Sequence, residues 1–275
     1  MATIEISAKD VFKLRKQTGA GMMDCKKALI EAEGDFEKAT DVLRKTGQKL
    51  ANKRADREAT EGYVLGFNNN EAASIIVLNC ETDFVAKNDD FASLVKRFAE
   101  VAVNSKSTSL EELKAQSIDG ITLDEKVVEQ TGVIGEKLDL SYFETVSGGK
   151  VTTYNHPGNR IASVVAFNKD TTDEIAKDVA MQVAAMSPVA LSKDDCPQEV
   201  IEKELEIAKD LLKQEGKPEA MIDKIAQGKL NKFFKENTLL NQGFIKDAKK
   251  SIQQYLNESD KELTVVAFKR YALGE

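Results

Sequence analysis

The sequence predicts an α+β protein, and three observations lead to that fold class. Short amphipathic helical patterns fill the first 47 residues, and an apolar strand-like segment occurs twice, each time followed by a helical pattern. A long, charged helical hairpin then interrupts the chain before its last strand. With 275 residues, 41% of them hydrophobic, the chain can bury more than one core, so we expect several domains.

Residues 1–47 have the start and stop signals of three helices. Polar residues that can cap a helix stand before each apolar pattern, and glycines follow it. The expected helices run from Ser7 to Thr18, from Asp24 to Gly34 and from Asp35 to Gly47. In the first, the start signal of Ser7 with Asp10 precedes the apolar residues Val11, Phe12 and Leu14. Helices this short cannot each hold a core, so they should form one bundle.

The stretch Gly19-Ala20-Gly21-Met22-Met23 separates the first two of these helices. Two glycines followed by two methionines predict a tight exposed turn that presents adaptable apolar side chains, although one methionine is expected to be buried. The charged segment 48–61 follows the bundle and includes Arg54 and Arg57. We interpret it as a linker or a solvated helix, and a solvated face is favoured over a basic site for an acidic partner.

An apolar segment is repeated within the chain. Residues 73–79 match residues 162–168 position by position in residue type, with a polar turn before each copy. A short run of bulky apolar residues such as Ile75, Ile76 and Val77 is typical of a strand buried on both faces. A helical pattern follows each copy, near Phe91 and near Ile175. The sequence therefore predicts an internal duplication of a hairpin-plus-helix unit.

The two connectors after these strands differ. The second, residues 169–174, is short and wholly polar, whereas the first, residues 80–90, is longer and contains Phe84. A lone aromatic in a loop more commonly folds back into its own core. However, connectors run over the surface, and the extra piece occurs in only one copy, so folding does not require it. We therefore expect Phe84 to be an exposed anchor for a partner protein.

The remaining elements follow from periodicity and turn residues. A hairpin is expected at 63–67 and 72–78, with small helices at 110–115 and 124–130. A second group of strands is expected at 138–146, 151–154 and 161–167, followed by a helix at 173–186 that ends before Ser187-Pro188. A helix near 248–256 and a strand at 263–271 complete the chain.

Residues 195–236 have a different pattern. Ile201, Leu205, Ala208 and Leu212 recur at spacings of four and three among many charged residues, and Gly216-Lys217-Pro218 then breaks the pattern. This arrangement predicts an antiparallel helical hairpin, interpreted as a projecting coiled coil. Such arms more often support assembly or docking than chemistry.

Charge and cysteine content limit the classes of partner. The net charge is −7 and the pI is about 5.1, so neither direct nucleic-acid binding nor membrane binding is expected. The first ten residues lack the pattern of a signal peptide, and no apolar run has the length of a membrane span. Cys25, Cys80 and Cys196 lie far apart with no C-x-x-C, which favours reduced thiols and a cytoplasmic location.

The sequence offers no recognisable catalytic chemistry. His156 is the single histidine and lies in a stretch, residues 155–160, that is typical of a hairpin turn. Residues 132–137, Gly-Val-Ile-Gly-Glu-Lys, are too short for a phosphate-binding loop and lack its hydroxyl residue. We therefore expect no catalytic residue, no cofactor and no metal site. An enzyme with a carboxylate site at Asp83, Asp89 and Asp90 is an alternative, although nothing in the sequence orients these groups.

Two long motifs resemble those of the translation elongation factor Ts family. They are residues 18–29, from Thr18 to Leu29, and residues 79–86, Asn-Cys-Glu-Thr-Asp-Phe-Val-Ala. A third block, which contains His156, Gly158, Arg160 and Ile161, is similar as well. The order and spacing of these blocks agree with the family over nearly the whole chain.

The resemblance implies a domain organisation. It implies a ubiquitin-associated-like three-helix domain at 1–54 and a duplicated core of antiparallel sheets with covering helices. The core subdomains are expected at 55–145 and at 146–194 with 237–275, and a coiled-coil arm at 195–236. Some members carry a further helical module after the last strand. Here the chain stops at Glu275, so any partner contact made by that module is expected to be missing or replaced.

The resemblance also implies guanine-nucleotide exchange on elongation factor Tu during protein biosynthesis, a role that needs no bond-making chemistry. The residues implied to press near the Mg²⁺ site of that GTPase are Thr82, Asp83, Phe84 and Val85. Those implied to make other contacts are Met22, Met23, Cys25, Lys26, His156, Gly158 and Arg160. Homodimerisation through the arm varies in such families and stays open. The alternative is a non-enzymatic module that binds another GTPase or a chaperone-like partner.

Overall fold

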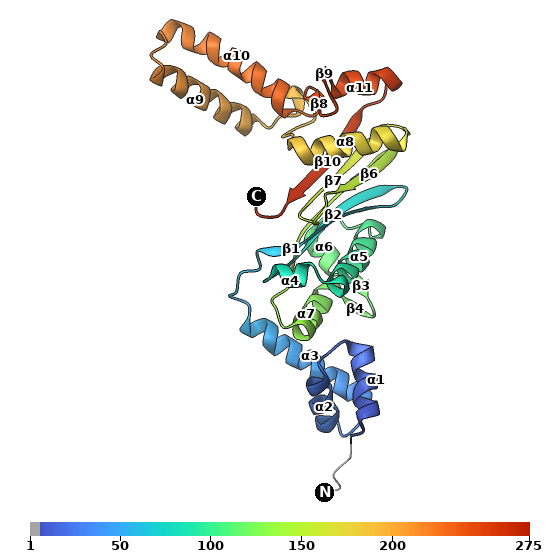
Figure 1. The fold of residues 1–275 in the computed structure, drawn as a ribbon. Coiled ribbons are helices and arrows are strands. Elements are labelled where there is room, and N and C mark those ends of the chain that lie inside the picture. Colours follow the sequence, from blue (N-terminus) through green and yellow to red (C-terminus); the bar gives the residue numbers. More distant parts are fainter. Residues whose placement is uncertain (1–5) are drawn as a thin grey trace. The chain divides into compact units, whose positions relative to one another are not determined.

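The computed structural model describes residues 6–275 of the chain, so the first five residues of the expected N-terminal domain lie outside it. The α+β class is confirmed, because helices and antiparallel sheets occur together (Figure 1). The chain divides into two compact units. Of the described residues, one unit contains 6–65, Ile76–Glu144 and Ala272–Glu275, and the other contains Gly66–Ile75 and Thr145–Tyr271.

Three helices form the N-terminal part of the first unit, as the sequence predicts: α1 (Ala8–Thr18), α2 (Met22–Glu31) and α3 (Phe36–Lys53). Two of the expected caps are present. The Ser7 hydroxyl accepts from the N–H of Asp10, and the Asp35 carboxylate accepts from two N–H groups at the start of α3. The helices share one core, which includes Val11, Leu14, Cys25, Leu29 and Ala39.

Several expected details of this bundle are wrong. Helix α2 begins at Met22, so the methionines lie in its first turn and Asp24 does not cap it. Both methionines are exposed, although one was expected to be buried, and Phe12 on α1 is exposed as well. Helix α3 does not end at Gly47 but continues to Lys53. The reason is that Gly47 serves a close contact with another helix rather than a turn.

The first three-stranded sheet has the order β1-β2-β5, with β1 at Glu61–Asn68, β2 at Ala72–Cys80 and β5 at Asp139–Ser147. The strand β2 is buried along nearly its whole length, as its apolar run predicts. After it come a single helical turn, α4 (Asp83–Ala86), and the long helix α5 (Asp89–Asn104).

A small helical insertion connects α5 to β5. It consists of α6 (Leu110–Lys114), the paired two-residue strands β3 (Ser117–Ile118) and β4 (Ile121–Thr122), and α7 (Leu123–Ile134). The two short strands were not expected, because two residues carry no periodicity. Helix α7 is longer than predicted: a capping box starts it, and Gly135, with a φ of 82°, ends it.

The second three-stranded sheet has the order β10-β7-β6, with β6 at Lys150–Asn155, β7 at Ile161–Phe167 and β10 at Val265–Ala272. The expected second strand group is therefore divided, because β5 pairs within the first sheet. Helix α8 (Asp173–Met186) follows β7 and has the predicted bounds. Thus β2 and β7 are both middle strands, each preceded by its neighbour in the sheet and followed by a long helix.

The arm forms the predicted helical hairpin, with α9 (Gln198–Gln214) and α10 (Glu219–Asn237) packed together through Ala208, Leu212, Ile222 and Ala226. A short 3-10 turn at Lys193–Asp195 precedes it. After the arm come β8 (Gly243–Phe244), β9 (Asp247–Ser251) and α11 (Ile252–Ser259). The helix expected from residue 248 therefore begins only at Ile252.

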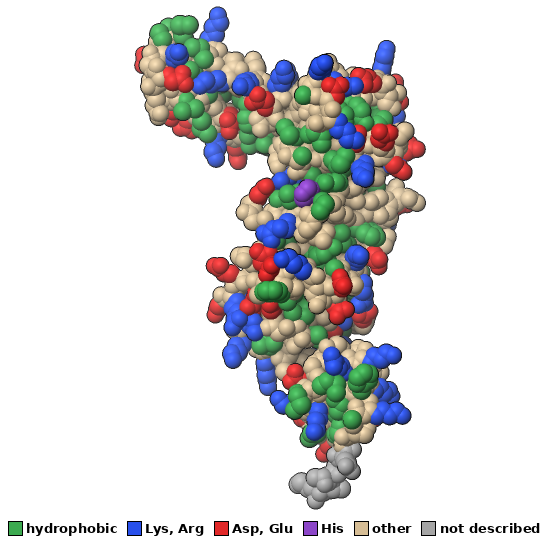
Figure 2. All heavy atoms as spheres, in the orientation of Figure 1, with side chains coloured by type: hydrophobic (Ala, Val, Ile, Leu, Met, Phe, Trp, Pro, Cys, Tyr) green, Lys and Arg blue, Asp and Glu red, His purple; other side chains and the backbone are tan. Residues whose placement is uncertain are grey.

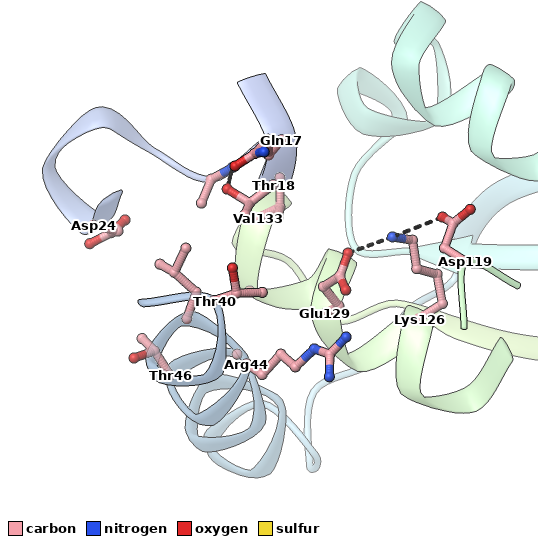
Figure 3. Close-up of a pocket in the computed structure, with 14 residues that line it drawn as sticks. Gln17, Thr18, Asp24, Thr40, Arg44, Thr46, Asp119, Lys126, Glu129 and Val133 are labelled. Atoms are coloured by element: carbon pink, nitrogen blue, oxygen red, sulfur yellow. Dashed lines mark hydrogen bonds and ion pairs between the residues drawn. The ribbon is translucent and has the colours of Figure 1, made fainter. Parts of the chain in front are cut away.

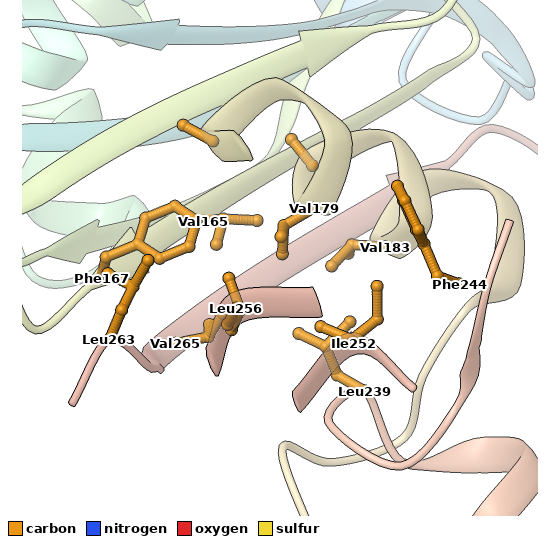
Figure 4. Close-up of a cluster of buried hydrophobic side chains, with 12 residues drawn as sticks. Val165, Phe167, Val179, Val183, Leu239, Phe244, Ile252, Leu256, Leu263 and Val265 are labelled. Atoms are coloured by element: carbon orange, nitrogen blue, oxygen red, sulfur yellow. The ribbon is translucent and has the colours of Figure 1, made fainter. Parts of the chain in front are cut away.

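The core of the second unit lies between its sheet and its helices. Side chains from β7, α8, α11 and β10 converge there, together with Leu239 and Phe244 (Figure 4). Within residues 6–275, no helix combines the length and the apolar composition that a membrane span requires.

Candidate functional site

The turn α4 presents a large apolar side chain to solvent. Phe84 is 83% exposed, whereas Phe91, at the start of α5, is 2% exposed. The expectation that the Phe84 ring faces outward is confirmed. The segment is not an irregular loop, however, because Thr82 caps one helical turn: its hydroxyl accepts from the N–H of Val85 at 3.4 Å.

The carboxylate on this turn is paired with a lysine one helical turn further on. Asp83 accepts from Lys87 at 2.6 Å, and this contact lowers the pKa of the Asp83 carboxyl. Asn88 caps α5 by accepting from the N–H of Asp90 at 2.8 Å, which sends the chain from the turn into a helix. The exposed ring of Phe84 therefore lies in a segment bounded by two N-terminal helix caps, Thr82 and Asn88.

Glu81, directly before the turn, is an ion-pair centre that the sequence analysis missed. Its carboxylate accepts from Arg54 at 2.6 Å, from Arg57 at 2.8 Å and from the backbone N–H of Lys137 at 2.6 Å. Burial by itself would raise the pKa of Glu81, but the N–H of Lys137 and the two guanidinium groups outweigh it and lower the pKa to about 2. Glu81 is therefore ionised at neutral pH.

The basic residues after the N-terminal bundle form ion pairs within the chain itself. Arg54 and Arg57 were expected to belong to a solvated face, but both pair with Glu81. The ammonium group of Lys137 donates to the carbonyls of Ala55 and Arg57 at 2.7 and 2.8 Å. The chain after α3 is thus fixed to the residue that precedes the candidate turn.

Cys80 closes the base of the turn. Its thiol is fully buried and donates to the carbonyl of Thr82 at 3.1 Å. Burial raises its pKa to about 12, so it stays protonated and unreactive at neutral pH. Cys25 and Cys196 are buried as well, and all three thiols are unpaired.

The N-terminal group of expected contact residues lies on α2. Met22 is 39% and Met23 63% exposed, and Lys26 is exposed. Cys25, by contrast, is fully buried, and its thiol donates to the carbonyl of Ala20 at 3.6 Å, so its side chain cannot contact a partner in this fold. Ile30, seven residues after Met23 and also exposed, extends the same helix face and was missed. Figure 2 shows hydrophobic side chains among lysines and arginines on these helices.

The third group lies in the turn between β6 and β7, within the second unit. The N–H of His156 donates to the carbonyl of Ile161 at 2.9 Å, which closes the predicted hairpin turn. Gly158 has a φ of 91°, a conformation that favours glycine. The side chains of His156 and Arg160 are exposed.

A cavity of about 280 Å³ lies in the first unit, lined by residues of α1, α3 and α7 (Figure 3). Thr18, Arg44 and Val133 contribute to its wall, and Lys126 there pairs with Glu129 at 2.5 Å and with Asp119 at 3.4 Å. None of the expected contact residues lines it. Among residues 6–275, no group of three or more His, Cys, Asp or Glu side chains is arranged to hold a metal ion.

These features define a class of protein. It is an α+β protein in which a capped helical turn, held beside the ion pairs of Glu81, exposes an aromatic ring, and in which a second helix exposes two methionines. The family model for elongation factor TS matches residues 81–275. Proteins called elongation factor Ts are similar over almost the whole chain. That of Christiangramia forsetii is 54% identical over 98% of this chain and 99% of the relative. That of Flavobacterium psychrophilum is 51% identical over the full length of both. That of Porphyromonas gingivalis is 48% identical over 98% of each. The chain belongs to the elongation factor Ts family.

Proposed function

We propose that this chain binds elongation factor Tu in its GDP form and promotes the release of GDP and the loading of GTP. The turn formed by Thr82, Asp83, Phe84 and Val85 enters the partner near its Mg²⁺ site and displaces the ion. Family membership supports this role. The observation that carries the assignment to this turn is the 83% exposure of Phe84 close to Glu81, which is fixed by its ion pair with Arg54.

The mechanism is a competition between ligands of the GTPase, and no covalent bond is made or broken. Mg²⁺ bridges the phosphates of the nucleotide and the loops of a GTPase. A ring that displaces those loops weakens the binding of the metal and of the nucleotide together. Because coupling between two ligands is reciprocal, this chain must bind the GDP-loaded partner more weakly than the empty one. GDP and GTP therefore both displace it, and their concentrations set the direction of exchange.

The other contacts distribute binding over the chain. Met22, Met23 and Lys26 touch the GTPase domain of the partner, supported by their exposure on one helix. His156, Gly158 and Arg160 contact the partner elsewhere, supported by their place in an exposed turn. Cys25 has no direct part in this proposal, because its side chain is buried.

We further propose that the N-terminal helices form a ubiquitin-associated-like domain and that the two sheets derive from a duplication. The equivalent places of β2 and β7 in their sheets support the duplication. The arm acts as a coiled coil that can join two copies of the chain, supported by the exposure of Ile207, Leu211 and Met221. Three unpaired buried thiols support a reducing, cytoplasmic location.

The test is the release of labelled GDP from elongation factor Tu, chased with unlabelled nucleotide, with and without this chain. The wild-type chain is expected to accelerate release, and Phe84→Ala to weaken the exchange complex by about 2 kcal/mol. Phe12→Ala is the matched control, because Phe12 is also exposed, on α1, and has no assigned contact. A wild-type chain that leaves release unchanged contradicts the exchange function. A Phe84→Ala variant as active as wild type contradicts the role of the ring.

A further inference from the structure

The segment Gly132-Val133-Ile134-Gly135-Glu136-Lys137, rejected above as a phosphate-binding loop, has a different use in the fold. Helix α7 ends within it, where the N–H of Gly135 donates to the carbonyl of Thr131 at 2.9 Å. The hydroxyl of Thr131 then accepts from the N–H of Leu138 at 3.3 Å. These two bonds shape the short link between α7 and β5, and they fix the backbone that carries Glu136.

Glu136 reaches from this link to the start of the candidate turn. Its Oε2 accepts from the backbone N–H groups of Glu81 and Thr82 at 3.1 and 3.0 Å. Its Oε1 accepts from the hydroxyl of Thr82 at 2.6 Å. One half-buried carboxylate therefore binds three donors on two consecutive residues.

The link and the turn hold each other reciprocally. Glu136 accepts from the backbone of Glu81 and Thr82, and the Glu81 side chain accepts from the backbone N–H of Lys137. One network of hydrogen bonds therefore joins Glu81, Thr82, Glu136 and Lys137. Charge-assisted hydrogen bonds of this kind are roughly twice as strong as neutral ones.

The turn needs such external support. Helix α4 has four residues and buries none of them, and an isolated helical turn this short is not stable in water. Its capping residue, Thr82, accepts from Val85 through the same hydroxyl that donates to Glu136. Glu136 thus fixes the side-chain rotamer of the residue that caps the turn.

We propose that Glu136 is a positioning residue for nucleotide exchange. It acts through Thr82 and has no contact of its own with the partner. It holds the capped turn in one conformation, so that Phe84 is presented before the partner arrives and little ordering remains to be done on binding. This inference rests on the proposed function of the turn.

The kinetic test compares Glu136→Gln with the wild-type chain in GDP release from elongation factor Tu. Glutamine keeps the size of the side chain but removes its charge, and its NH₂ group cannot accept from the Thr82 hydroxyl as Oε1 of Glu136 does. In the variant, a smaller fraction of the chains holds the turn in the conformation that promotes exchange. The maximal rate of GDP release at saturation should therefore drop about tenfold. The half-saturating concentration should change less, because the other contacts with the partner remain. Glu112→Gln is the matched control, since Glu112 also accepts from a backbone N–H and a threonine hydroxyl, at Thr108. It should leave the rate unchanged.

A second readout needs no partner. The chain contains no tryptophan, so Phe84→Trp introduces a single fluorophore on the turn. In that background, Glu136→Gln should speed the decay of tryptophan anisotropy in the free protein, whereas Glu112→Gln should not. Far-UV circular dichroism checks that both proteins stay folded. If Glu136→Gln does not fold, Glu136→Asp, which keeps the charge on a shorter side chain, replaces it with intermediate effects expected.

The outcomes separate the two proposals. A wild-type chain without exchange activity removes the proposed function, and the anisotropy alone then decides whether Glu136 orders the turn. A folded Glu136→Gln variant with an unchanged maximal rate or an unchanged anisotropy decay overturns the positioning role.

Discussion

Two phenylalanines seven positions apart, Phe84 in α4 and Phe91 in α5, have opposite surroundings. Phe91 is 2% exposed, whereas Phe84 is 83% exposed on its one-turn helix. Their difference follows from what each segment can bury: α5 has a continuous apolar face, whereas α4 buries no residue. A side chain that is mostly exposed to solvent contributes little to stability and remains available to a partner.

The two rings should therefore differ sharply on truncation. Phe91→Ala is expected to lower the free energy of unfolding by about 3–5 kcal/mol, because it leaves a cavity in the core. Phe84→Ala should change it by less than about 0.5 kcal/mol, as is usual for surface sites. Urea unfolding of both variants measures the difference. Equal losses would mean that the Phe84 ring packs into its own domain.

Glu81 makes stability depend on pH. Its pKa falls from 4.5 to about 2 in the folded protein, so it stabilises the fold fully above pH 4.5, and this contribution is lost as the pH falls toward 2. Glu81→Gln should therefore lower the free energy of unfolding at neutral pH by up to about 3 kcal/mol. The gap between variant and wild type should narrow on acidification. Urea unfolding over that pH range tests this, and a constant gap contradicts the ion-pair account.

At the scale of elements, helices α3 and α7 approach each other at two glycines. A Cβ atom on Gly132 would lie 2.6 Å from the Cα of Gly47, closer than real side chains come. Gly47 therefore does not end α3 but allows α7 to contact it. Glycine at position 47 lowers the helix propensity of α3 but allows the two helices to pack closely.

Substitutions at two helical glycines test this account. Gly132→Ala should lower the free energy of unfolding by about 1–3 kcal/mol through overpacking, although alanine is the better helix former. Gly228→Ala is the control, since Gly228 lies in α10 with nothing within 4 Å of the added Cβ. It should raise the free energy by about 0.4–1 kcal/mol. Thermal unfolding measures both, and a stabilising Gly132→Ala would contradict the close contact.

At the scale of the whole molecule, the arm enters and leaves its unit at paired backbone segments. Ala190 bridges Thr238, and the N–H groups of Val189 and Leu239 donate to the carbonyls of Asn237 and Ala190, both at 2.9 Å. The arm also has a core of its own between α9 and α10. The two segments that connect the arm to its unit are thus hydrogen-bonded to each other, and these bonds do not involve α9.

Replacing residues 197–236 with a short Gly-Ser linker should leave the remainder folded. The circular dichroism spectrum should lose helix in proportion to the removed residues, and the truncated chain should still unfold cooperatively. Sedimentation of both chains tests the proposed dimer, because only the full chain should associate through the arm. An insoluble truncated protein would show that the arm is needed for folding.

The sequence by itself determined the α+β class, the three N-terminal helices, the middle strands β2 and β7, the helical hairpin and the exposure of Phe84. Each depends on a periodicity or a repeat that can be read locally. Only the tertiary structure decided the pairing of β5 with β2, the continuation of α3 through Gly47 and the burial of Cys25. The same holds for the contacts of Glu81 and Glu136 at the base of the turn. Most of these features join residues far apart in the sequence, such as Glu81 and Lys137, which are 56 positions apart, and a contact between distant residues leaves no periodic pattern along the chain.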